Sequence, residues 1–139
     1  MTEQEQTDQN FMKLALEQGQ LAYDAGEVPV GAVVVLDGQV IGRGYNKPIT
    51  SLDPSAHAEV VALRDAALNI GNYRLANAVL YVTVEPCTMC SGLLVHSRIA
   101  RLVYGTTEPK SGVIESAMCL LEQPFYNHKI EITGGVLAQ

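Results

Sequence analysis

The 139-residue sequence lacks any apolar run near the roughly 18 residues that a membrane-spanning helix needs. Its opening segment, MTEQEQTDQN, has neither the basic start nor the apolar stretch of a secretory signal peptide. These two absences predict a cytoplasmic protein with no membrane partner.

An excess of basic residues is also lacking, because 9 Lys and Arg stand against 15 Asp and Glu, for a formal net charge of −6. Taken alone, an acidic balance argues against a nucleic-acid partner. The imbalance is local, however: residues 1–27 carry six acidic residues and one lysine, a balance of −5, so residues 28–139 carry only −1. The total charge is therefore a poor guide to the partner.

Cysteine is scarce and odd in number, since the chain has three. A fully paired disulfide framework is thereby excluded. Cys87 and Cys90 form a Cys-x-x-Cys pair, which in a reducing compartment favours a metal-binding or catalytic role, and Cys119 stands alone. With 47% apolar and 17% charged residues, the composition excludes disorder and indicates one globular domain over residues 1–139.

The hydrophobic periodicity predicts alternating helices and strands. Thr7 or Asp8 is a candidate N-cap for the first helix, and Asp53-Pro54 or Ser55 starts the second. We expect helices at 8–25, 55–70, 86–96 and 113–123, and strands at 30–36, 39–45, 78–84, 98–104 and 129–133. This order predicts an α/β fold, a three-layer α-β-α sandwich around a five-stranded mixed, mostly parallel sheet.

The most informative residues are His57, Glu59, Cys87 and Cys90, which lie where a strand or loop enters a helix. Imidazole and thiolate are good zinc ligands, and three protein ligands leave the fourth tetrahedral position for water, as in catalytic zinc sites. Glu59 follows His57 by two residues, so it is a poor fourth ligand but a candidate general acid/base in the same cavity. The pattern predicts a catalytic zinc site.

A purely structural zinc site would need a fourth protein ligand. Cys119, His96 and His128 are the remaining candidates. Each has a simpler interpretation, as an apolar filler, a cation at a helix C-terminus and a loop residue, respectively. The spacing His-x-Glu followed by Pro-Cys-x-x-Cys is the signature of zinc nucleobase deaminases, which favours the catalytic interpretation.

The chain resembles the cytidine deaminase-like superfamily, and within it is similar to bacterial tRNA-specific adenosine deaminases, from about Phe11 to Leu137. Besides the zinc motifs, the similarity rests on Glu27-Val28-Pro29-Val30-Gly31-Ala32, Asn46-Lys47-Pro48-Ile49, Asp53-Pro54-Ser55-Ala56, Asn72-Tyr73-Arg74-Leu75, His96-Ser97-Arg98-Ile99 and Asn127-His128. The zinc motif alone indicates only the superfamily, whereas the surrounding blocks indicate the tRNA enzymes.

This resemblance implies a cytidine deaminase-like fold and hydrolytic deamination of adenosine to inosine at the wobble position of a tRNA anticodon stem-loop. It also implies one zinc ion per chain, a homodimer, and a proton shuttle at Glu59. The residues that it places at the substrate are Asn46, Val30, Ala58, Glu85, Pro86 and Lys110.

Two departures from the family accompany this resemblance. Glu108 stands where an aspartate is expected, next to nucleotides that flank the target base. Family members also continue past the equivalent of Leu137 with a basic, aromatic-containing helix, so we expect a domain that lacks this helix. Its loss would leave zinc binding and the core unchanged and remove contacts that support RNA affinity.

Two alternatives stay open. One is a deaminase of a free base or nucleoside, such as guanine, cytosine or cytidine, with the same metal chemistry. The other is a non-catalytic zinc scaffold, which Glu59 disfavours because a scaffold has no use for a carboxylate beside the metal. An RNA substrate would be supported by a basic rim around the pocket, for which the candidates are Lys47, Arg74, Arg98, Lys110 and Lys129.

Overall fold

The computed structural model describes residues 1–138 and is built around a sheet with the strand order β2-β1-β3-β4-β5. The strands are β1 (Gly31–Leu36), β2 (Gln39–Tyr45), β3 (Val79–Val84), β4 (Arg101–Thr106) and β5 (Glu131–Thr133). β1 pairs antiparallel with both β2 and β3, whereas β3–β4 and β4–β5 are parallel. The predicted five-stranded mixed sheet is confirmed, but parallel pairings do not predominate.

The antiparallel half follows from a tight turn between β1 and β2. Asp37 and Gly38 both have positive φ values, of 50° and 78°. This is the geometry of the two-residue hairpin turns that Asp-Gly favours, and such a turn allows only antiparallel pairing. Asp37 and Gly38 thus join β1 and β2 into a hairpin.

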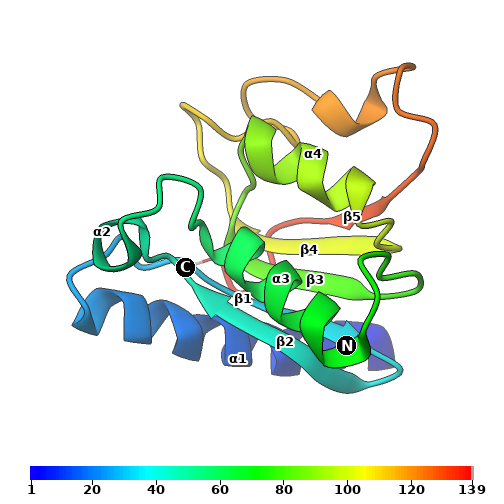
Figure 1. The fold of residues 1–139 in the computed structure, drawn as a ribbon. Coiled ribbons are helices and arrows are strands. Elements are labelled where there is room, and N and C mark those ends of the chain that lie inside the picture. The colour runs from blue at the N-terminus through cyan, green and yellow to red at the C-terminus, as the bar shows by residue number, and fades with distance from the viewer. Residues whose placement is uncertain (139) are drawn as a thin grey trace.

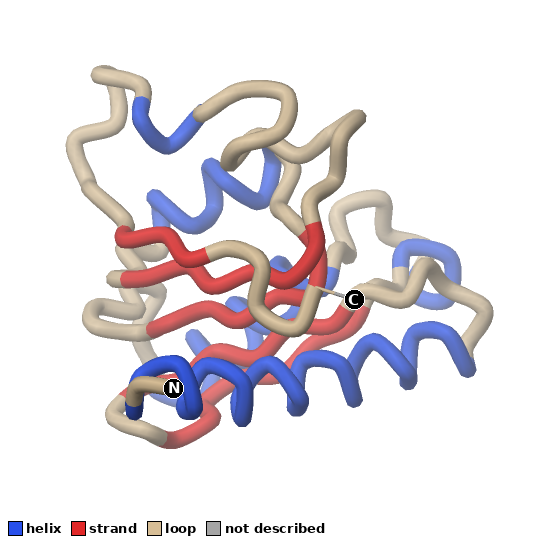
Figure 2. The backbone as a smooth tube through the Cα atoms, turned by 180° about the vertical axis from the view of Figure 1, so that it is seen from behind, coloured by secondary structure: helices blue, strands red, loops and turns tan. Residues whose placement is uncertain are grey.

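Helices cover both faces of the sheet, as the predicted α-β-α sandwich requires. α3 (Ala58–Ile70) and α4 (Thr88–His96) pack on one face (Figure 1), and α1 (Glu3–Asp24) runs across the other face (Figure 2). Successive residues of a strand point to opposite faces. In β1, Ala32 and Val34 accordingly join the core beneath α3 and α4, whereas Val33 and Val35 join the core beneath α1.

The first helix begins earlier than predicted. Thr2 is its N-cap: the Thr2 hydroxyl accepts a hydrogen bond from the Glu5 amide at 3.0 Å, and the Thr2 amide donates to the Glu5 carboxylate at 3.1 Å. This reciprocal capping box satisfies amides that the helix leaves free. The N-cap predicted at Thr7 or Asp8 was therefore wrong, and Asp8 is a buried residue inside the helix.

Two other helix starts were predicted too early, and one predicted helix is absent. α3 begins at Ala58 with His57 as N-cap, and α4 begins at Thr88 with Cys87 as N-cap. Within the described chain, segment 113–123 forms turns and a short 3₁₀ helix, η1 (Leu120–Glu122). A short helix that was not predicted, α2 (Pro48–Ser51), lies in the loop before α3.

α3 approaches β2 closely because β2 carries glycines at the contact. A Cβ on Gly42 would lie 2.4 Å from the Ala62 carbonyl oxygen, and a Cβ on Gly44 would lie 2.5 Å from the Ala62 amide nitrogen. No side chain fits at either distance. The two glycines thereby set the position of α3, and with it the place of His57 and Glu59 at its start.

Among residues 1–138, no helix has both the length and the apolar character needed to cross a membrane.

Candidate active site

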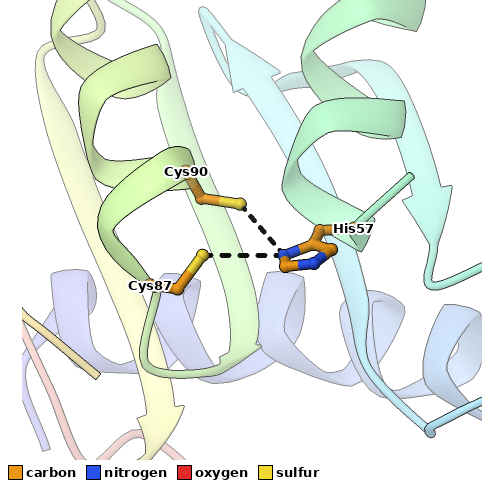
Figure 3. Close-up of side chains that lie close together, drawn as sticks. All are labelled: His57, Cys87 and Cys90. Carbon is orange, nitrogen blue, oxygen red and sulfur yellow. Dashed lines mark hydrogen bonds between the residues drawn. The ribbon is translucent and has the colours of Figure 1, made fainter. Parts of the chain in front are cut away.

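Three potential metal ligands meet between the starts of α3 and α4. The Nδ1 atom of His57 lies 3.6 Å from the Cys87 sulfur and 3.5 Å from the Cys90 sulfur (Figure 3). His57 and Cys87 are the N-cap residues of their helices, and Cys90 lies in the first turn of α4. The convergence of two helix N-termini therefore builds the cluster predicted from the sequence.

The donor set fits zinc. Tetrahedral zinc with bonds of about 2.0–2.3 Å to nitrogen and sulfur separates its ligand atoms by about 3.5–3.8 Å, close to the distances between the imidazole nitrogen and the two sulfurs. The three ligand atoms lie within 4.8 Å of one another. Among the described residues, they form a group of side chains that could hold a metal ion. Three protein donors leave one tetrahedral position for a further ligand.

The surroundings of Cys87 favour a thiolate. A hydrogen bond from the Cys90 thiol lowers the pKa of Cys87 to about 5, and the same hydrogen bond raises the pKa of Cys90. The N-terminus of α4 adds partial positive charge beside both sulfurs. A bound cation favours the thiolate form of both residues.

Glu59 is buried beside this cluster. It is the second residue of α3 and is 4% exposed. Burial raises the pKa of its carboxyl group to about 7. Such a group exchanges a proton readily near neutral pH, which is what a general acid/base requires.

His57, Glu59 and Cys87 open onto a cavity of about 200 Å³. Its wall is formed by the segment before β1, the end of β3, the loop before α2, the starts of α3 and α4, and the segment after β4. The lining residues are Val28, Val30, Asn46, His57, Glu59, Val84, Glu85, Cys87, Glu108 and Ser111. Polar groups therefore converge on a cavity with apolar sides, the arrangement typical of a small-molecule or nucleobase site.

The predicted substrate residues divide between the cavity and its surroundings. Asn46, Val30 and Glu85 line the cavity. Ala58 and Pro86 are fully buried and do not line it, so only their backbone lies near the site. Lys110 is exposed beside the lining residue Ser111 and does not line the cavity.

The sequence did not indicate two of the lining residues, Val84 and Ser111, and it did not place a third, Glu108, in the wall of the cavity. Val84 and Ser111 carry no local signal, because one is a typical strand residue and the other lies in an irregular segment. Glu108 was singled out only as a departure from the family, yet it forms part of the wall.

The other candidate ligands and cations lie elsewhere. The His128 ring makes a 2.7 Å hydrogen bond with the Ile99 carbonyl oxygen, and Cys119 is exposed. His96, Arg74 and Arg98 line a separate hollow of about 370 Å³. None of the three candidate fourth ligands belongs to the metal cluster of the described residues, and the five predicted cations do not form one rim.

The model of the cytidine and deoxycytidylate deaminase zinc-binding region matches residues 5–106, which include all three ligands and Glu59. The chain belongs to this deaminase family. Zinc is accordingly its cofactor, and His57, Cys87 and Cys90 are the residues suited to hold it.

Members of the family that act on tRNA are among the most similar proteins. The chain is 51% identical to the tRNA-specific adenosine deaminase of Haemophilus influenzae over 95% of this chain and 77% of that protein. It is 41% identical to the enzyme of the same name from Bacillus subtilis, over 95% of this chain and 82% of that protein. Within the family, the chain therefore groups with tRNA-specific adenosine deaminases.

Solved structures agree with this grouping. A structure from a study of A-to-I editing by tRNA:A34 deaminases at the wobble position matches with a TM-score of 0.90 and 43% identity, over 93% of this chain and 94% of the other. Guanine deaminase from Bacillus subtilis matches less completely, with a TM-score of 0.69 and 38% identity, over 77% and 66% of the two chains. The cytidine deaminase-like fold expected from the sequence is confirmed.

Proposed function

We propose that this protein is a zinc-dependent hydrolase that converts adenosine to inosine at the wobble position of a tRNA anticodon. The observation that carries the proposal is the buried Glu59 beside the cluster of His57, Cys87 and Cys90, at a cavity of about 200 Å³. The 51% identity to a tRNA-specific adenosine deaminase supports adenosine in tRNA as the substrate.

The overall reaction replaces the amino group at C6 of adenine by oxygen from water and releases ammonia. Zinc held by three protein ligands supplies Lewis-acid activation of a water molecule. Because C6 is inaccessible in a stacked helix, the base must leave the stack to enter the cavity.

Glu59 carries the protons in this proposal. Its carboxylate accepts a proton from the attacking water and donates it to N1 of the ring. It then accepts the second proton of that water oxygen and donates it to the amino group, which departs as ammonia. Val30 and Val84 form apolar sides against the base, and the Asn46 amide supplies a hydrogen-bond donor and acceptor to the nucleotide.

We also propose that the protein acts in the cytoplasm as a homodimer that binds the anticodon stem-loop of tRNA. Met89 in α4, next to Cys90, and Ile49 in α2 are apolar side chains, 41% and 71% exposed, that a second copy of the chain would cover. Analytical ultracentrifugation of the purified protein should give twice the chain mass, and a monomer at micromolar concentration would contradict the dimer.

A substrate panel tests the activity. The protein is incubated with an anticodon stem-loop carrying a wobble adenosine, and separately with free adenosine, cytidine, cytosine and guanine. We expect inosine in the RNA and slow or no conversion of the free compounds. Conversion of guanine or cytidine without inosine in the RNA would replace this proposal by a free-base or nucleoside deaminase.

A further inference from the structure

The Glu85 carboxylate lies at the end of β3, two residues before Cys87, and is only 3% exposed. Both of its oxygens are occupied by hydrogen-bond donors from one segment. Oε2 accepts from the backbone amides of Ile114, Glu115 and Ser116 at 2.9, 2.7 and 2.9 Å. Oε1 accepts from the Glu108 amide at 3.1 Å and from the Ser116 hydroxyl.

The segment that these bonds hold, residues 107–119, has no helix or strand to fix it. It nevertheless forms one wall of the cavity, through Glu108 and Ser111. Besides Glu85, the Pro86 carbonyl oxygen ties the segment to the β3–α4 connection by accepting from the Val113 amide at 3.0 Å. Residues 113–116 have further anchors, because the Tyr104 hydroxyl donates to the Glu115 carboxylate and Ile114 is buried in the core. The bond from the Glu108 amide to Glu85 ties the cavity-lining part of the segment to the end of β3.

The fit between Glu85 and the segment is close. A Cβ on Gly112 would lie 2.5 Å from the Cδ and Oε1 atoms of Glu85. The segment can wrap the carboxylate only because residue 112 has no side chain. Glu85 thus sets the path of the segment on both sides of Gly112, at Glu108 and at Ile114.

We propose that Glu85 is a positioning residue that fixes the cavity wall formed by Glu108 and Ser111, and thereby sets how tightly the nucleotides around the target base fit. This inference rests on the proposed function for its substrate. It concerns the Glu85 side chain, because hydrogen bonds within the protein occupy both carboxylate oxygens, whereas the resemblance places the backbone around Glu85 at the substrate.

The Glu85→Gln variant tests the inference with little change of shape. The remaining carbonyl oxygen can still accept from the amides of residues 114–116. The new NH2 group faces the Glu108 amide, where two donors then meet, while the Ser116 hydroxyl can rotate to accept. Glu85→Gln should therefore release the Glu108 end of the segment, whereas Glu85→Ala should release both ends.

Hydrogen exchange and steady-state kinetics are measured on the zinc-loaded protein, with the substrate that the panel above identifies. In Glu85→Gln, exchange at the Glu108 amide should accelerate at least about tenfold, the loss expected for one charge-assisted hydrogen bond. KM should rise by roughly tenfold with kcat within about twofold, because the wall moves while the acid/base group does not. Zinc content should stay at one per chain.

Asp8→Asn is the matched control, since Asp8 is also a buried carboxylate with several donors but belongs to α1, outside the cavity lining. At a temperature where it is folded, its KM should equal that of the wild type. Gly112→Ala perturbs the tether, by which we mean the hydrogen bonds from residues 108 and 114–116 to Glu85, and it leaves the charge of Glu85 unchanged. It should raise KM, as Glu85→Gln should.

Unchanged exchange at Glu108 in Glu85→Gln would overturn the tether itself. Faster exchange with unchanged KM in both Glu85→Gln and Gly112→Ala would overturn its role in substrate fit. If the wild type converts a free base and no RNA, the proposed function fails. Hydrogen exchange at the Glu108 amide in Glu85→Gln still shows whether Glu85 holds the segment.

Discussion

The imidazole Nδ1 of His57 lies 3.5 Å from the sulfur of Cys90, although 33 residues separate the two in the sequence. α3 and α4 bring them together because each helix starts at the same edge of the sheet, next to the cavity. A ligand at a helix N-cap has an extended backbone that aims its side chain past the helix end, as His57 does with φ of −69° and ψ of 154°.

Removal of His57 should remove the metal. We predict that His57→Ala lowers the zinc content from one per chain to near zero, because two thiolates alone complete only half of a tetrahedral site. Elemental analysis of the purified protein measures this. Cys119→Ala is the matched control, since Cys119 is exposed and outside the cluster, and it should keep full zinc content. Equal zinc in wild type and His57→Ala would contradict the assigned site.

Glu59 should matter for turnover and not for the metal. We predict that Glu59→Gln keeps zinc and the fold but lowers kcat at least ~10²-fold, because the amide cannot accept and return the proton. Single-turnover kinetics with zinc analysis on the same preparation measures both properties. Turnover near the wild-type rate would exclude Glu59 from proton transfer.

Much of the site could be predicted from the sequence because its chemistry lies in short motifs. His57, Glu59, Cys87 and Cys90 are specified by residue type and spacing. The cavity wall formed by Glu108 and Ser111 could not be predicted, because segment 107–119 takes its path from hydrogen bonds to Glu85, which lies more than 20 residues earlier in the sequence. The donation of three consecutive amides to Glu85 also replaces the helix expected at 113–123.

The starts of α1 and α3 were also predicted wrongly, because hydrogen bonds near each start change where the helix begins. At α1, the local capping box of Thr2 and Glu5 extends the helix to Glu3, and Asp8 is held inside it by a partner 93 residues away. At α3, the Asp53 carboxylate accepts from the Ser55 amide and hydroxyl, which forms a turn where the sequence suggested a helix start. Both helix starts are therefore set by local hydrogen bonds between side chains and backbone, whereas the burial of Asp8 depends on the distant Arg101.

The buried ion pair of Asp8 and Arg101 should stabilise the fold. The Arg101 guanidinium donates to both Asp8 oxygens at 2.7 Å, and the Tyr81 hydroxyl donates to one of them at 2.8 Å. Asp8→Asn should lower the free energy of unfolding at pH 7 by about 3 kcal/mol, because it leaves a buried charge without its partner. Urea denaturation measures the loss, and a change below about 0.5 kcal/mol, typical of surface sites, would contradict it.

This contribution should also depend on pH. Burial raises the pKa of Asp8, but the hydrogen bonds from Arg101 and Tyr81 outweigh burial and hold it below its usual value. The stabilisation is therefore fully present above the unfolded pKa of about 3.9 and is lost as the pH falls through the lower folded value. The difference in unfolding free energy between wild type and Asp8→Asn should shrink below pH 4, and a difference that grows on acidification would contradict this.

Close packing of α3 on β2 gives a test of the fold. Gly44→Ala should lower the free energy of unfolding by about 3 kcal/mol, because its Cβ would meet backbone of α3 at 2.5 Å. Gly92→Ala is the matched control: it lies inside α4, where the nearest contact is 3.7 Å away, and alanine favours a helix. It should leave stability unchanged or raise it by up to about 1 kcal/mol. Equal effects of both substitutions would contradict the packing.

A cavity that takes the wobble base of an anticodon loop should discriminate between positions in that loop. Two reactions of the zinc-loaded protein are compared: one with an anticodon stem-loop that has adenosine at the wobble position, and one with the same stem-loop with that adenosine moved one position along the loop. We predict inosine and an equal amount of ammonia from the first RNA and little of either from the second. No inosine from the first RNA, or equal conversion of both, would contradict a wobble-specific tRNA adenosine deaminase.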